Sequence, residues 1–177
     1  MAWNTPKTWG YKETLSSSDM NTYIRDNLNA LRDGSALNIT WQSFTPTFAW
    51  SVGSIVNGNA TISGKYFQLG KFVFYKIKYI LGSTTSWAGC SGYFTFTLPV
   101  TSVALYVQYP RMGHGSMFDA NGIVYPAVGI QRTVTTCSIE RLDASGVSSY
   151  DNDISTTTPF TWAPGDEIYM EGFYEVP

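Results

Sequence analysis

One segment near the start of the chain has apolar positions at helical spacing, three or four residues apart. These positions are Met20, Ile24, Leu28 and Leu31. Side chains at this spacing share one face of an α-helix. Ser16 is a good N-cap residue, and Asp19 follows three positions later, as in a capping box with Asp in place of Glu. The pattern therefore predicts an amphipathic helix over residues 17–33, with Gly34 just after its end.

This predicted helix carries an apolar stripe that must be buried somewhere. A single helix of this length is marginally stable in water, so the stripe needs a partner. Two partners are compatible with the sequence: the β domain of the same chain, or other chains in a short helical bundle around a symmetry axis. Residues 1–15, which precede the helix, are largely polar and are expected to form an extended arm.

From about residue 37 onward the hydrophobic period changes from helical to alternating, which is typical of β-strands. The clearest strand covers residues 72–79, and its two faces differ in character. One face would carry Val73, Tyr75, Ile77 and Tyr79, and the other Phe72, Phe74, Lys76 and Lys78. The lysines indicate that the second face is partly in contact with water.

Several other short runs have strand character and are separated by turn residues. They cover residues 59–67, 93–98, 103–107, 116–130, 134–142 and 167–174. Asn121–Gly122 would turn a hairpin within the fourth run. The region predicts about seven to nine strands and no second helix. We therefore expect a mainly β fold, an antiparallel β-sandwich or jelly-roll-like domain over residues 37–177, preceded by the arm and one amphipathic α-helix in residues 1–36.

Composition supports a stable β domain and argues against nucleic acid and membrane as partners. The chain of 177 residues is 16% aromatic but only 14% charged, against about 25% in typical proteins. The net charge of −2 and the lack of a basic block exclude the usual electrostatic signature of a nucleic-acid-binding protein. No run of about 18 apolar residues occurs, so no membrane span is expected. Cys90 and Cys137 are the only cysteines, and we expect both to be free.

The residues capable of catalysis do not form a recognisable constellation. His114 is the only histidine, and its place in Gly113-His114-Gly115 indicates a surface loop. Most carboxylates lie beside Gly, Asn or Ser in predicted turns rather than as a pair in a cleft. Asp151-Asn152-Asp153 offers oxygen ligands but lacks the Gly and the distant Glu of an EF-hand loop. We therefore expect no catalytic residue, no cofactor and no metal, in a protein that is not an enzyme.

Aromatic side chains near turns are the remaining candidates for ligand contact. Four aromatic residues lie near turn or strand-end signals, where an aromatic face can bind a sugar or a protein partner: Trp41, Trp50, Trp87 and Tyr150. The alternative is that these side chains are buried in the core or in a subunit interface, as most tryptophans are. Trp87 and Tyr150 are therefore the ligand-facing residues that the sequence suggests.

Two motifs stand out in the N-terminal segment. They are Trp3-Asn4-Thr5-Pro6-Lys7-Thr8-Trp9 followed by Glu13, and Met20-Asn21-Thr22-Tyr23-Ile24-Arg25-Asp26-Asn27-Leu28. Together they resemble a signature of minor structural proteins of tailed bacteriophages, which runs W-x-T-P-[RK]-T-W, a Glu, and then L-N-x-x-[IL]-R-D-N-L. Met20 stands where that signature has Leu, and Tyr11-Lys12 precedes Glu13 where the signature has Gly. Gly64-Lys65-Tyr66 and Phe96-Thr97-Leu98-Pro99-Val100 more loosely resemble segments of phage fibre and decoration proteins.

The resemblance implies a structural protein of the virion, a homotrimer assembled in the cytoplasm of a bacterial host. The N-terminal segment would dock on other virion proteins of the capsid or tail, and the β-sandwich would project as a fibre or decoration component. The docking residues would be Trp3, Trp9, Met20, Ile24, Leu28 and Leu31 through apolar burial, and Arg25 and Asp26 through charge pairing. The alternative is a receptor- or glycan-binding module of a phage tail, whose partner would be a glycan of the host surface.

Overall fold

The chain forms two compact units in a computed structural model, which describes residues 3–32, 40–104, 110–142 and 153–177. The first unit is Met1–Thr40 and the second is Trp41–Pro177. The expected boundary between residues 36 and 37 lies outside the described residues.

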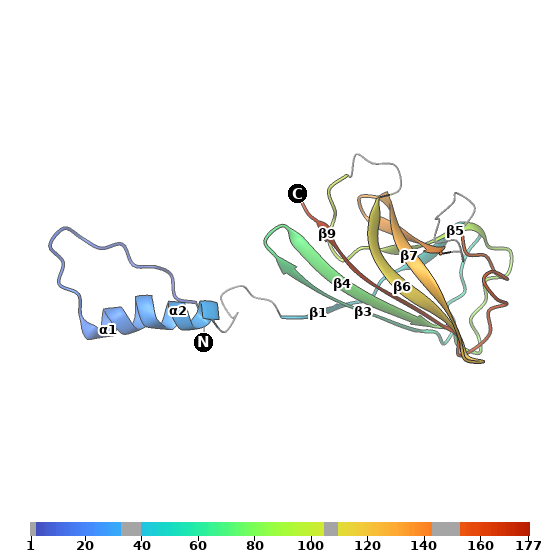
Figure 1. The fold of residues 1–177 in the computed structure, drawn as a ribbon, viewed down its shortest axis with the longest axis horizontal. Coiled ribbons are helices and arrows are strands. Elements are labelled where there is room, and N and C mark those ends of the chain that lie inside the picture. Colours follow the sequence, from blue (N-terminus) through green and yellow to red (C-terminus); the bar gives the residue numbers. More distant parts are fainter. Residues whose placement is uncertain (1–2, 33–39, 105–109, 143–152) are drawn as a thin grey trace. The chain divides into compact units, whose positions relative to one another are not determined.

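The first unit contains one helical segment, built from three consecutive parts. These are α1 (Ser17–Asp19), the π-helical η1 (Met20–Arg25) and α2 (Asp26–Arg32) (Figure 1). The predicted start is confirmed, since the Ser16 hydroxyl accepts the Asp19 amide hydrogen at 3.0 Å and the Asp19 carboxylate accepts the Ser16 amide hydrogen at 3.4 Å. The sequence did not predict the π-helical turns, and the expected stop at Gly34 lies outside the described residues.

The second unit is mainly β, as predicted, and all its described strands belong to one antiparallel sheet. The strands are β1 (Gln42–Phe44), β2 (Phe48–Val52), β3 (Thr61–Leu69), β4 (Phe72–Ile80), β5 (Ser91–Thr97), β6 (Arg111–Asp119), β7 (Ile123–Thr133), β8 (Thr136–Arg141) and β9 (Glu167–Glu175). Their order across the sheet is β1-β3-β4-β9-β6-β7-β8-β5-β2. Figure 1 shows the curvature of this sheet along β4, β9, β6 and β7.

The curling brings strands that are far apart in the sheet order into contact across a shared core. Tyr79 of β4 lies 4.8 Å from Phe48 of β2, and Tyr75 of β4 lies 5.7 Å from Phe96 of β5, measured between ring centroids. The fold is therefore sandwich-like although the sheet is continuous. Such aromatic pairs contribute about 0.5–1.5 kcal/mol each beyond their burial, so the high aromatic content has a direct structural use.

The alternation predicted for β4 is confirmed residue by residue. Val73, Tyr75, Ile77 and Tyr79 are at most 1% exposed. Phe72 is exposed, and Phe74, Lys76 and Lys78 are half-buried on the opposite face. We call this opposite face of β3, β4 and β9 the outer face. Cys90 and Cys137 are both buried and free, as expected.

The hairpin predicted at Asn121–Gly122 is also confirmed, and it joins β6 to β7. Gly122 has a positive φ of 99°, which favours glycine, and its amide donates to the Asp119 carbonyl oxygen at 2.8 Å. The Asp119 carboxylate additionally accepts the Asn121 amide hydrogen at 2.8 Å.

The expectation that Gly113-His114-Gly115 forms a loop is wrong, because these residues lie inside β6. A Cβ atom at position 113 would lie 2.4 Å from the Glu171 carbonyl oxygen and 2.6 Å from the Tyr75 hydroxyl oxygen. Glycine is present at position 113 because the neighbouring strand and the Tyr75 side chain approach the backbone closely, not because the chain turns. The side chain of His114 points to solvent from the strand and is 77% exposed.

One predicted strand, over residues 103–107, is not formed by its described part. Val103 and Ala104 are outside any strand, and the Val103 amide makes a single bond to the Glu175 carbonyl oxygen at 2.9 Å. The rest of this run lies outside the described residues.

Candidate docking surface of the N-terminal unit

The arm of the first unit is fixed to its helix by reciprocal hydrogen bonds between two asparagines. The Asn27 side-chain oxygen accepts the Asn4 amide hydrogen at 2.8 Å, and the Asn27 side-chain amide donates to the Asn4 carbonyl oxygen at 3.0 Å. The same Asn27 amide group donates to the Tyr23 carbonyl oxygen at 3.1 Å. Asn27 is only 6% exposed, so these bonds satisfy a buried polar group.

A second contact between arm and helix is formed around Lys7. Its ammonium group pairs with Glu13 and lies 3.5 Å from the Asp19 carboxylate. It also lies 4.7 Å from the ring centroid of Trp9, and that ring meets Tyr23 edge-on at 6.3 Å. The arm is therefore a folded part of this unit rather than a free extension.

These contacts alter the acidity of the groups that make them. The hydrogen bond from Lys7 lowers the pKa of Glu13, and the same bond raises the pKa of Lys7. The Ser16 hydroxyl donates to Asp19 at 2.6 Å and lowers the pKa of that carboxyl below its ordinary value. All three groups are therefore held in the charged form that the arm contacts require.

The apolar stripe of the helix is only partly covered in this unit. Its four side chains are exposed to the following fractions: Met20 43%, Ile24 40%, Leu28 60% and Leu31 46%. By contrast, Asn27 and Ala30 on the same helical segment are 6% and 0% exposed. The segment thus buries polar and small residues and presents its large apolar ones, which is the reverse of an ordinary amphipathic helix.

The other residues expected to take part in docking are two half-exposed tryptophans and one pair of opposite charges. Trp3 and Trp9 are 45% and 38% exposed. Arg25 and Asp26 are paired with each other, since the Arg25 guanidinium lies 2.8 Å from the Asp26 carboxylate. Their charges are compensated within the unit, and a partner chain would have to compete with this neighbouring pair.

The sequence missed Asn27, which is the residue that organises this unit. Its position inside the predicted helix was a signal for this role, because asparagine is unfavourable inside a helix unless its side chain has a specific partner.

The aromatic residues that the sequence suggested as ligand-facing are mostly not exposed in the described residues. Trp50 and Trp87 are 5% and 6% exposed, so the expectation of a solvent-facing ring is corrected for both, whereas Trp41 is 42% exposed. The Trp87 ring lies 5.0 Å from Phe94 and 5.2 Å from Trp162. Burial among other aromatic rings is the physical reason, and Tyr150 lies outside the described residues.

The described residues were also compared with what a metal site and a membrane-spanning helix require. No group of three or more His, Cys, Asp or Glu side chains there could hold a metal ion. Among the same residues, no helix has the length and apolar character needed to cross a membrane. In comparisons with known proteins, no family model matches the chain, no curated protein matches its sequence, and no solved structure matches its fold.

Proposed function

We propose that this chain is a non-enzymatic structural protein of a tailed-bacteriophage virion, docked on the particle by its N-terminal unit. The observation that supports the proposal is the exposed apolar stripe of Met20, Ile24, Leu28 and Leu31 beside an arm that is already folded. The N-terminal motif that resembles the phage signature covers the same residues. The second unit would then project from the particle as a fibre or decoration component of tail or capsid.

Burial of the stripe supplies the free energy for docking. Full burial of a large aliphatic side chain is worth about 1.5–3 kcal/mol, and these side chains retain roughly half of that because they are partly covered already. The arm contacts made by Asn4 and Lys7 order the unit before it binds, which reduces the entropy lost on association. Three copies related by a symmetry axis would cover one another's stripes, so we propose a homotrimer as the docking form.

The proposal is tested by placing a charge in the stripe of the full-length protein. Leu28→Asp should abolish incorporation into purified phage particles, measured by quantitative mass spectrometry of the particles. The matched control is Ser18→Asp, which adds the same charge at an exposed polar position of the same helical segment, away from the stripe. Equal incorporation of the two variants would contradict the docking proposal, provided that both retain the melting temperature of the second unit.

A second candidate function, recognition of a glycan on the host surface, is favoured by a separate observation. Exposed aromatic rings and lysines lie together on the outer face of the second unit.

A further inference from the structure

Four aromatic side chains form a continuous row across the outer face of the second unit. Phe67, Phe74 and Phe173 are cross-strand neighbours on β3, β4 and β9, and Trp41 lies just before β1. Ring centroids are 4.8 Å apart for Trp41 and Phe67, 4.8 Å for Phe67 and Phe74, and 5.8 Å for Phe74 and Phe173. Trp41 and Phe173 are 42% and 60% exposed, so this aromatic row is accessible at both ends.

Two lysines lie directly beside the aromatic row and face each other across β3 and β4. Lys65 and Lys76 are paired in register, a placement in which like charges reduce stability. In the part of the chain that the structure describes, neither has a carboxylate within ion-pair distance, and the Lys76 ammonium lies 4.5 Å from the Trp41 ring centroid. Lys78, one step further along β4, is compensated by Glu167 at 2.8 Å. Lys76 is also in register with Glu171 of β9, whereas the in-register neighbours of Lys65 are Ser43 and Lys76, so an anionic ligand would relieve the repulsion at Lys65.

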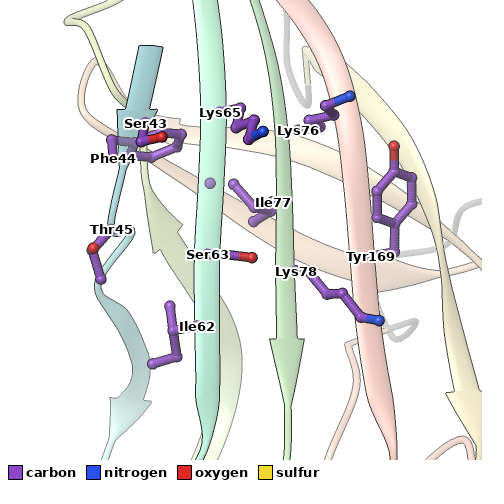
Figure 2. Close-up of a pocket in the computed structure, with 11 residues that line it drawn as sticks. Ser43, Phe44, Thr45, Ile62, Ser63, Lys65, Lys76, Ile77, Lys78 and Tyr169 are labelled. Atoms are coloured by element: carbon purple, nitrogen blue, oxygen red, sulfur yellow. The ribbon is translucent and has the colours of Figure 1, made fainter. Parts of the chain in front are cut away.

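Two adjoining shallow hollows lie on this face. One, of about 290 Å³, lies along the aromatic row and reaches Lys76, His114 and Glu171. The other, of about 360 Å³, lies next to the point where β1 separates from β3 after Phe44. Figure 2 shows Lys65 and Lys76 on neighbouring strands of this second hollow, with Tyr169 across from them on β9. Lys76 lines both hollows and so connects them.

Hydrogen-bonding groups surround the lysines on the same face. Ser43 and Ser63 line the larger hollow, and each offers a hydroxyl that can donate or accept. Tyr169 donates to the Glu171 carboxylate at 2.5 Å, and the Nε2 atom of His114 lies 3.5 Å from the same carboxylate. The face thus combines apolar ring surfaces, neutral hydroxyls, the ammonium groups of Lys65 and Lys76, and the Glu171 carboxylate.

We propose that this outer face binds an acidic saccharide, with sugar rings against the aromatic row and a carboxylate or phosphate at Lys65 and Lys76. A pyranose ring has an apolar C–H face and a polar rim of hydroxyl groups, and this face offers a partner for each. A subunit contact fits less well, because the centre of a protein interface is depleted of charged residues, and here the lysines lie beside the rings. Single-stranded nucleic acid fits less well too, since it needs an extended basic groove.

This inference goes beyond the docking role, because it concerns the other unit of the chain. Its failure would leave the apolar stripe of the first unit unaffected, and the two proposals can be tested separately.

The test uses the full-length protein on a glycan array that carries neutral, carboxylated and phosphorylated saccharides. The strongest acidic glycan is then titrated calorimetrically against two variants, Lys65→Ser and Phe173→Ala. The matched controls are Lys71→Ser, an exposed lysine outside the row, and Val124→Ala, an exposed apolar residue on β7. We expect binding to acidic saccharides alone, weakened about tenfold or more by each test variant and less than about twofold by each control.

Three results would overturn the proposal. The first is the absence of binding to any acidic saccharide, or equal binding to its neutral counterpart. The second is tighter binding to a thymidine oligonucleotide of fifteen residues, which would assign the face to nucleic acid. The third is a smaller assembly for Phe173→Ala than for the wild type in sedimentation equilibrium, which would make the aromatic row a subunit contact. Comparison of the carboxylated with the phosphorylated saccharides on the array shows which of the two anionic groups the face binds.

Discussion

Asn4 and Asn27 lie 23 positions apart in the sequence and exchange two hydrogen bonds, at 2.8 and 3.0 Å, in the first unit. This pairing makes the arm and the helix one structural element. It also explains the orientation of the helix, because the face that carries Asn27 is occupied by the arm. The large apolar side chains on the remaining surface are then free for another chain.

Replacing Asn27 should release the arm. Asn27→Ala leaves the Asn4 amide and carbonyl without their side-chain partners, and a lost buried pairing costs about 1–3 kcal/mol. We expect amide hydrogen exchange at Asn4 to accelerate by about tenfold or more, measured by NMR on the full-length protein. Asn21→Ala, at an exposed position of the same segment, serves as the control. Unchanged exchange at Asn4 in the Asn27→Ala variant would show that the arm is held by other contacts.

The close approach of β6 and β9 predicts a strong effect of a single methyl group. Gly113→Ala would place a Cβ atom 2.4 Å from the Glu171 carbonyl oxygen, so the strands must shift. Overpacking of this kind lowers the free energy of unfolding by about 1–3 kcal/mol, and urea unfolding measures this decrease. Ser116→Ala on the same strand should change stability by less than about 0.5 kcal/mol. If the two variants unfold at the same urea concentration, the described spacing of β6 and β9 is incorrect.

A buried carboxyl on β8 predicts a specific dependence of stability on pH. Glu140 is 6% exposed, and burial raises its pKa above the ordinary value of 4.5, although the Arg132 guanidinium at 2.8 Å opposes the shift. The folded state therefore binds a proton at pH values where the unfolded state has released it. The free energy of unfolding should accordingly decrease as pH rises through the interval just above 4.5.

Glu140→Gln removes this titration and should flatten the decrease. The measurement is urea unfolding of both proteins at several pH values between about 4 and 7. Glu175→Gln, which removes an exposed carboxylate at the end of β9, should keep the wild-type slope. If the Glu140→Gln variant follows the wild-type curve, the role assigned to this carboxyl is wrong.

Oligomerisation through the apolar stripe gives a further prediction. The chain has a mass of 19.6 kDa, and sedimentation equilibrium should give three times that molar mass, because three stripes can cover one another around an axis. Leu28→Asp should sediment as a monomer, since a carboxylate cannot be buried there without a partner. Ser18→Asp, which places the same charge away from the stripe, should remain trimeric. A monomeric wild type at all accessible concentrations would count against the trimer.

The sequence predicted those elements in which local pattern and tertiary environment agree. The β4 strand was predictable because its alternation matches the core on one side and water on the other. The cap at Ser16 and the turn at Gly122 were predictable because both depend on neighbouring backbone groups only.

Three of the failures involve contacts between residues distant in the sequence. Gly113 looked like a turn residue because nothing near it in the sequence reveals that Tyr75 and β9 approach its backbone. Trp87 lies in a connection between strands, yet it is buried because Trp50, Phe94 and Trp162 converge on it from other segments. Apart from Trp41, the aromatic row was missed for the same reason, since Phe67, Phe74 and Phe173 become neighbours only through the register of β3, β4 and β9.

The most direct test of the docking account is hydroxyl-radical footprinting of the apolar stripe in the free chain and in assembled particles. Met20 and Leu28, which are 43% and 60% exposed, should react readily in the free chain and become protected in the particle. Ile123 and Val124, 51% and 58% exposed on the second unit, provide the internal reference and should react equally in both states. Equal reactivity of Met20 and Leu28 in the free and assembled protein would contradict the account.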